Sequence, residues 1–260
     1  MTCYPAVKNT TFFCKRGIEP CYNGGETSNF KESVRVKIVC FGDSLTEVGY
    51  GSSYVQELVR LMPEHDFINA GEGGNTVINL LRRVDDDVLS HQPDAVFVMV
   101  GGNDAISFSQ PKTRSYYRQK QEIPDGVVTP EQFETAYREL LTKLQLAHVV
   151  VWIGLEPCEY NLATVEAFRD YNARIKNIAR SFNLPVLDLM ESFPPSDVPD
   201  RPALGVEYIL TIGAREKRGW AGYEEAQKAG GYQFTFDGLH LPPETAKKVA
   251  QLIAEFIRSN

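Results

Sequence analysis

The feature that most constrains the fold of this chain is a regular alternation between short apolar runs and segments with helical spacing. Runs rich in β-branched and other apolar side chains occupy positions 36–41, 66–69, 95–100, 149–153 and 185–189. Between them, apolar residues recur three and four positions apart, as in Val77, Leu80, Leu81, Val84 and Val88. Strands that alternate with helices form a parallel sheet covered by helices on both faces. The sequence therefore predicts an α/β fold, a three-layer α/β/α sandwich around a five-stranded parallel sheet.

Four short motifs follow the predicted strands or precede the last predicted helix. They read Gly-Asp-Ser-Leu at 42–45, Gly-Gly-Asn-Thr at 73–76, Gly-Gly-Asn-Asp at 101–104 and Asp-Gly-Leu-His at 237–240. In open α/β sheets, ligands bind beyond the carboxyl ends of the strands, where the strand order reverses. If the strand order is the flavodoxin-like 2-1-3-4-5, the reversal lies between the first and third strands, and Ser44 and Asn103 should face each other there. We expect the four motifs to converge on one crevice.

Three of the motif side chains have the chemistry that acyl transfer through a serine requires. The Ser44 hydroxyl is a poor nucleophile at neutral pH unless a base takes its proton during the attack. His240 is the candidate base, because an imidazole titrates close to neutrality and can later return that proton to the leaving alcohol. Asp237 lies three residues before His240, so in a tight loop its carboxylate should reach the ring and fix its tautomer.

The same motifs offer donors for the oxyanion that forms during such an attack. A tetrahedral intermediate requires hydrogen-bond donors already directed at its negative oxygen. We assign this role to the backbone N–H groups of Ser44 and Gly74 and to the side-chain amide of Asn103. Asp43 and Asp104, next to these groups, are expected to organise their loops or cap helices rather than to transfer protons.

This ordered set of motifs resembles the SGNH hydrolases, also called the GDSL esterase and lipase family. The resemblance covers roughly residues 36–256 and implies a flavodoxin-like sandwich with the strand order given above. It also implies catalytic roles for Ser44, Asp237 and His240, and an oxyanion hole formed by Ser44, Gly74 and Asn103. Gly-Asp-Ser-Leu alone is a weak signal, whereas the ordered set is specific. The chain lacks the Gly-x-Ser-x-Gly turn of an α/β-hydrolase.

The activity that the resemblance implies is that of a carboxylic ester hydrolase acting through an acyl-enzyme on Ser44. Short acyl groups such as acetyl are favoured, because no amphipathic helix suited to a membrane surface is evident. Two alternatives stay open: an acyltransferase that passes the acyl group to a sugar or alcohol, and a non-catalytic module that binds carbohydrate or acyl groups. The expected partner is a small-molecule, carbohydrate or lipid ester. The sequence leaves the oligomeric state open.

Charge and composition argue against several other classes of function. A net charge of −7 disfavours binding to nucleic acid, because the field of the protein repels polyanions. No apolar run has the length of a bilayer span, and the first 15 residues lack the pattern of a secretory signal. We therefore expect a cytoplasmic protein or one whose signal was removed. Neither a metal nor a cofactor is indicated, since no ligand cluster or phosphate-binding fingerprint is present.

The segments outside the alternation divide the predicted chain. Residues 1–33 are polar and rich in turns, which predicts an N-terminal extension before a catalytic domain at 34–260. Two insertions, at about 105–129 and 194–236, interrupt that domain and are expected to be lids or disordered segments near the site. The first contains a basic stretch, 112–120, whose simplest interpretation is a solvated loop, and whose alternative is a site for an anionic group.

Overall fold

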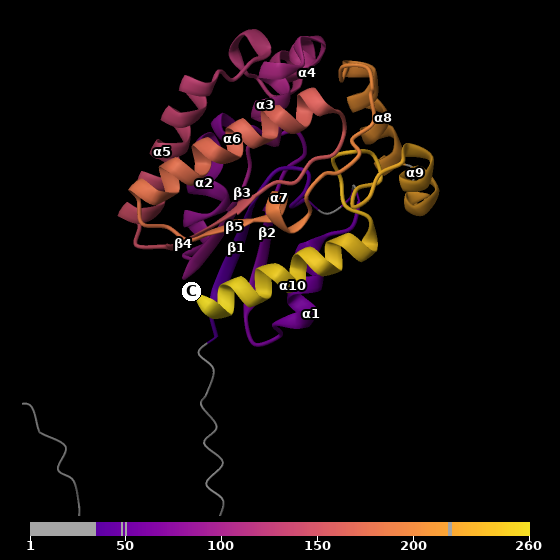
Figure 1. Ribbon diagram of the computed structural model, residues 1–260. Coiled ribbons are helices and arrows are strands. Elements are labelled where there is room, and N and C mark those ends of the chain that lie inside the picture. The colour runs from indigo at the N-terminus through magenta and orange to yellow at the C-terminus, as the bar shows by residue number, and fades with distance from the viewer. Residues whose placement is uncertain (1–34, 48, 50, 218–219) are drawn as a thin grey trace, which may run out of the picture. The chain divides into compact units, whose positions relative to one another are not determined.

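A single parallel sheet, with strands in the order β2-β1-β3-β4-β5, forms the centre of the described chain. The structure is a computed structural model, and it describes residues 35–260 apart from 48, 50, 218 and 219. The predicted extension, residues 1–33, lies outside the described residues. The predicted fold and strand order are confirmed (Figure 1). The strands are β1 (Lys37–Gly42), β2 (Asp66–Gly71), β3 (Ala95–Met99), β4 (Val150–Leu155) and β5 (Val186–Asp188).

Alternate side chains of the strands enter two separate cores, one on each face of the sheet. On β1, Val39 and Phe41 join one core, whereas Ile38 and Cys40 join the other. β3 repeats the pattern, because successive side chains of a strand point to opposite faces. Burial on both faces explains why these strands are continuous apolar runs in the sequence.

Helices cover both faces of the sheet. On one face lie α2 (Val77–Asp87), α5 (Pro130–Leu146) and α6 (Leu162–Ser181), and on the other lie α1 (Tyr54–Leu61) and α10 (Pro243–Ser259) (Figure 1). The sequence did not predict α1. This helix of eight residues is capped by the Ser53 side chain and has too few turns for a clear periodic signal. The predicted start of the last helix at Pro243 is confirmed.

The two predicted insertions contain helices rather than irregular chain. The first includes most of α3 (Gly102–Ser109) and all of α4 (Arg114–Lys120); the second includes α8 (Val206–Lys217) and α9 (Tyr223–Gly230), after the short α7 (Leu189–Ser192). These helices are short, and α9 has no buried residue. Their apolar residues therefore do not repeat over enough turns to predict a helix.

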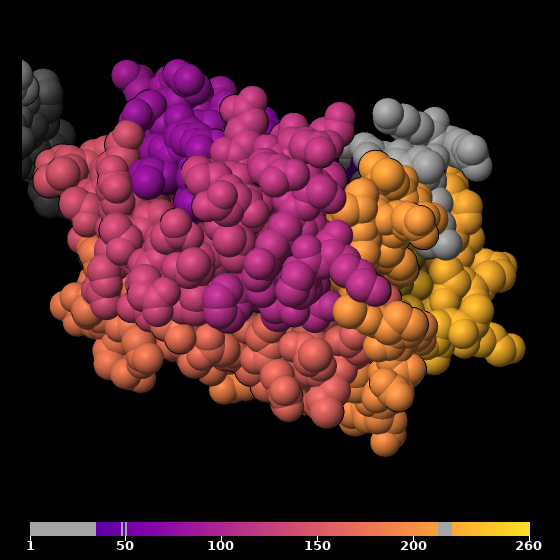
Figure 2. Space-filling model, turned by 90° about the horizontal axis from the view of Figure 1, so that it is seen from above, coloured from indigo at the N-terminus to yellow at the C-terminus, as the bar shows by residue number. Residues whose placement is uncertain are grey.

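Both insertions lie at the end of the sheet where the strands have their carboxyl ends. Figure 2, viewed onto this end, shows the magenta surface of the first insertion beside the orange surface around α8. A hydrogen bond of 3.0 Å from the Leu204 N–H to the Gln110 side chain joins the two insertions. No helix in the described part of the chain has both the length and the apolar composition that crossing a membrane requires. The predicted cytoplasmic location stays a prediction.

Candidate active site

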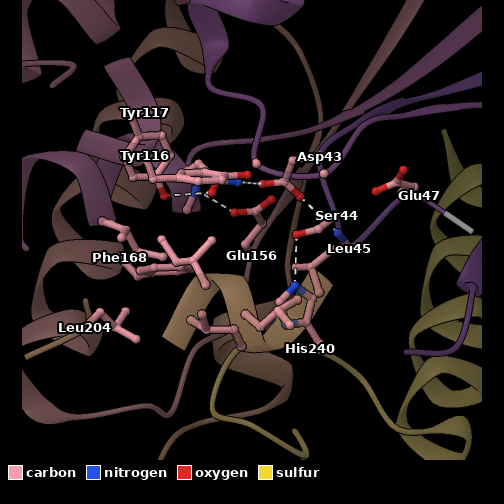
Figure 3. A pocket seen from close by; sticks show the side chains of 18 of the residues that line it. Asp43, Ser44, Leu45, Glu47, Tyr116, Tyr117, Glu156, Phe168, Leu204 and His240 are labelled. Atoms are coloured by element: carbon pink, nitrogen blue, oxygen red, sulfur yellow. Dashed lines mark hydrogen bonds between the residues drawn. The ribbon is translucent and has the colours of Figure 1, made fainter. Parts of the chain in front are cut away.

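Ser44, His240 and Asp237 form a continuous hydrogen-bonded chain at this end of the sheet. Ser44 lies in the turn after β1, and His240 precedes α10. The Ser44 Oγ is 2.9 Å from His240 Nε2 (Figure 3). On the other side of the ring, His240 Nδ1 is 2.8 Å from Asp237 Oδ2. The structure thus brings together three residues whose positions differ by as many as 196 in the sequence.

The hydrogen bonds of Asp237 determine which nitrogen of His240 carries the proton. Asp237 Oδ1 accepts the N–H groups of Leu239 at 2.9 Å and of His240 at 2.7 Å, and Oδ2 faces the ring. An ionised carboxylate only accepts, so Nδ1 must donate and Nε2 is left to accept from Ser44. Burial raises the pKa of Asp237, but the adjacent imidazole and the N–H donors outweigh burial and leave this pKa below its usual value. Asp237 is therefore ionised at neutral pH.

The loop that carries Asp237 and His240 is held by the segment after β4. Gly238 has a φ of +90°, and a Cβ there would lie 2.6 Å from the Tyr160 backbone, so the turn requires glycine. The buried Glu159 carboxylate accepts the N–H groups of Gln233, Phe234 and Thr235 at 2.6–2.9 Å. This role of Glu159 could not be predicted from the sequence, since its partners lie more than 70 residues away.

Asn103 is fixed from two sides. Its amide nitrogen donates to Asp43 Oδ2 at 2.7 Å, and its carbonyl oxygen accepts from the Tyr117 hydroxyl at 2.8 Å. Because an amide nitrogen carries two protons, the second proton is available to a ligand oxygen in the cavity that Asn103 lines. Asp43 also accepts the Leu45 N–H at 3.1 Å, so it organises the loop as predicted.

Gly74, the other predicted donor, also lines the cavity and lies in a loop fixed by the first insertion. It has a φ of +78°, and a Cβ there would collide with the Tyr116 hydroxyl, so glycine is required. Gln121 donates to the Gly73 carbonyl at 3.1 Å and accepts from the Asn75 side chain at 3.2 Å. These contacts fix the direction of the loop that presents the Gly74 backbone to the cavity.

The solvated-loop interpretation of the basic stretch 112–120 is wrong for its two tyrosines. Tyr117 is 1% exposed and Tyr116 is partly buried, and both line the cavity, whereas Lys112, Arg118 and Lys120 are exposed. Aromatic residues within a polar stretch were the available signal for this role. The structure gives the tyrosines hydrogen-bonding roles beside Asn103 and Gly74.

Asp104 caps a helix rather than orienting Asn103. Both oxygens of its carboxyl group accept the N–H of Val77, the first residue of α2, at 3.1 and 3.2 Å. The side chain is fully buried, and burial raises its pKa well above the usual value. Cys158 is likewise buried, and its thiol is free.

A cavity of about 490 Å³ opens beside Ser44 and His240. Its polar wall contains Asn103 and the two glycines of the second motif. Asp43 and Glu47 belong to the same wall (Figure 3). Its apolar wall comes from both insertions, α6 and the loop before His240, and consists of Ile106, Phe168, Leu204, Ile209, Leu210, Ile212 and Leu239. The Tyr208 hydroxyl donates to the Asp237 carbonyl and so ties α8 to the same loop.

The model of the GDSL-like Lipase/Acylhydrolase family matches residues 40–209, which include the first three motifs. The chain belongs to this family. The predicted resemblance is thereby confirmed, and the prediction of a carboxylic ester hydrolase agrees with it. The acetylxylan esterase of Geobacillus stearothermophilus is 35% identical over 86 residues, which cover 26% of this chain and 39% of that protein. The chain therefore matches well under half the length of this relative.

Solved structures support the fold over a longer range. The acetyl xylan esterase AlAXEase superposes with a TM-score of 0.58 at 21% identity, covering 85% of this chain and 100% of that chain. The acetylxylan esterase Axe2 of Geobacillus stearothermophilus gives 0.59 at 20% identity, with 85% and 94% covered. A lipase/acylhydrolase of Enterococcus faecalis gives 0.56 at 20% identity, with 86% and 96% covered. At these identities the likeness establishes a shared fold.

Proposed function

We propose that this family member is a serine esterase that hydrolyses carboxylic esters through an acyl-enzyme on Ser44. The observation that carries the proposal is the hydrogen-bonded chain Ser44–His240–Asp237, with distances of 2.9 and 2.8 Å, beside a cavity. This arrangement provides a nucleophile, a base with its free nitrogen directed at the nucleophile, and a carboxylate that stabilises the imidazolium.

The first half of the reaction forms the acyl-enzyme. Ser44 Oγ attacks the carbonyl carbon while His240 Nε2 takes the hydroxyl proton. The negative oxygen then accepts from the backbone N–H groups of Ser44 and Gly74 and from the second amide proton of Asn103. When the intermediate collapses, the alcohol leaves with the proton from His240.

Water completes the cycle. His240 takes a proton from a water molecule whose oxygen attacks the acyl carbon, and the same donors hold the second oxyanion. Collapse of this intermediate returns the proton to Ser44 Oγ and releases the carboxylic acid. Asp237 stays ionised throughout, since its lowered pKa favours the carboxylate next to the imidazolium.

Acetyl is the acyl group that we propose first, and the likeness to acetylxylan esterases supports it. One observation favours a second candidate, an ester with a longer apolar group. The apolar wall formed by Phe168, Leu204 and their neighbours exceeds what an acetyl methyl group can contact. A series of p-nitrophenyl esters from acetate to octanoate separates the two, because kcat/KM falls steadily with chain length only if acetyl is preferred.

Hydrolysis of p-nitrophenyl acetate by wild type, Ser44→Ala and His240→Ala tests the reaction itself. The proposal predicts that both variants lose nearly all turnover while staying folded. Unchanged hydrolysis in both variants would reject an esterase at this site. Adding a competing alcohol tests transfer, since free acid as the main product supports hydrolysis and an acylated alcohol supports an acyltransferase.

A further inference from the structure

A buried carboxyl pair lies beside the triad and has no part in the mechanism described above. Glu156, the residue after β4, and Asp43, the residue before Ser44, are each 2% exposed. Figure 3 shows their carboxyl groups facing each other at the cavity wall. Glu156 Oε2 accepts the Gly102 N–H at 2.6 Å. The pair therefore connects the ends of β1, β3 and β4.

Two ionised carboxylates in this position would repel each other without solvent to screen them. Both oxygens of Asp43 already accept from donors, namely the Leu45 N–H and the Asn103 amide. Within the described residues, Glu156 Oε1 is buried and has no donor to accept from. A proton on Glu156 Oε1, donated to Asp43, removes the repulsion and gives the buried oxygen a partner.

The electrostatic environment places this proton on Glu156 rather than on Asp43. Burial, reinforced by the charge of Asp43, raises the pKa of Glu156 well above its usual value. Burial also raises the pKa of Asp43, but hydrogen bonds from Leu45, Glu156 and Asn103 oppose that rise. The hydrogen bond between the two carboxyl groups thus stabilises the neutral form of Glu156 and the charged form of Asp43.

We propose that Glu156 is a positioning residue: as a neutral acid it donates to Asp43, which holds the Asn103 amide, and it accepts from the adjacent Gly102 N–H. The inference rests on the proposed function, because Asn103 is the side-chain donor to the oxyanion. Gly102 allows the close approach, since a Cβ there would collide with the Glu156 carboxyl group. Glu156 thereby fixes both the side chain of Asn103 and the backbone next to it.

Glu156→Gln and Glu156→Met form the test pair. Gln is neutral, donates through its amide and accepts through its carbonyl oxygen, so we expect kcat within about threefold of wild type. Met has a similar size and neither hydrogen bond. A displaced oxyanion donor should lower kcat about 10–100-fold while KM changes by less than about threefold. Glu166→Met, at an exposed position of α6, is the matched control and should match wild type.

Thermal unfolding of each variant accompanies the kinetics. A merely structural role would lower the melting temperature of Glu156→Met and leave the kcat of the folded enzyme unchanged, which would overturn the inference. Equal losses of kcat in the Gln and Met variants would also overturn it, because a neutral donor would then be insufficient. If wild type and Ser44→Ala hydrolyse the ester equally, the proposed function fails instead.

Infrared difference spectroscopy at neutral pH tests the proton on Glu156 without relying on activity or on the Met variant. We expect the spectrum of wild type minus Glu156→Gln to contain the C=O stretch of a protonated carboxyl group. A carboxylate band in its place would contradict the inference, whatever the kinetic results.

Discussion

The Tyr117 hydroxyl donates to the Asn103 carbonyl oxygen at 2.8 Å, so the insertion that contains α4 positions a proposed oxyanion donor. Tyr117 is almost completely buried and contacts Tyr116 edge to face, with ring centroids 5.2 Å apart. A segment expected to be a lid or disordered thus forms part of the site. Hydrogen bonds from this segment hold Asn103 and the loop that contains Gly74 in place.

Tyr117→Phe should lower kcat on p-nitrophenyl acetate about 2–10-fold, the equivalent of one hydrogen bond of about 0.5–1.5 kcal/mol. KM should change little, because the ring and its packing remain. Tyr137→Phe is the matched control, since the Tyr137 hydroxyl is buried in α5 without a hydrogen-bond partner in the described residues. Equal effects of the two substitutions would contradict a positioning role for Tyr117.

Asn103→Ala should lower kcat about 10²–10³-fold, the usual cost of removing one oxyanion donor. The loss should be smaller than that of Ser44→Ala, because the nucleophile and the backbone donors remain. Steady-state kinetics on p-nitrophenyl acetate measure both losses. Turnover of Asn103→Ala within about threefold of wild type would mean that the Asn103 amide does not stabilise the transition state.

Glu159→Gln should reduce the free energy of unfolding by about 1.5–3 kcal/mol. In Gln, an NH2 group replaces one carboxylate oxygen, and this group cannot accept a backbone N–H. The carboxylate accepts three backbone N–H groups and the Thr235 hydroxyl. Urea unfolding measures the change, and Glu166→Gln at an exposed position is the control. Identical midpoints for the two variants would show that these hydrogen bonds do not stabilise the loop before Asp237.

The free energy of unfolding of Asp104→Asn should exceed that of wild type by a margin that grows as the pH rises. Burial raises the folded-state pKa of Asp104 well above the unfolded value. Between those two pKa values the folded protein keeps a proton that the unfolded chain has lost. The free energy of unfolding of wild type therefore falls by about 1.4 kcal/mol per pH unit from this group alone. The introduced amide cannot ionise, and its carbonyl oxygen can still accept the Val77 N–H.

Urea unfolding of both proteins at several values between about pH 5 and pH 8 checks this difference. Asp43 and Glu156 are near Asp104 and titrate in both proteins, so only the difference between the two curves is informative. A constant difference across that range would contradict a neutral Asp104 in the folded state.

The sheet and the triad were predictable from the sequence for physical reasons. The strands β1, β3 and β4 are buried along almost their whole length and are therefore continuous apolar runs in the sequence, which made them predictable. The strand order followed from the resemblance to the SGNH hydrolases rather than from these runs. Asp237 and His240 are three residues apart in a tight loop, so their contact is local. Ser44 meets His240 because the topology of the sheet and the start of α10 bring both to one end.

The residues that support the site could not be predicted in the same way. Glu159 holds residues 233–235, and Glu156 faces Asp43, through contacts between parts of the chain far apart in the sequence. Neither residue belongs to a motif or a periodic pattern. The short helix α4 gave no helical signal, and so the positions of Tyr117 and Gln121 followed from tertiary packing alone.

Mass spectrometry of the protein after reaction with a fluorophosphonate tests the nucleophilic role of Ser44 most directly. We expect a single adduct on the peptide that contains Ser44, and much slower labelling of His240→Ala. If Ser44 stays unmodified in protein that hydrolyses p-nitrophenyl acetate, or if an adduct on a different serine abolishes this hydrolysis, Ser44 is not the nucleophile.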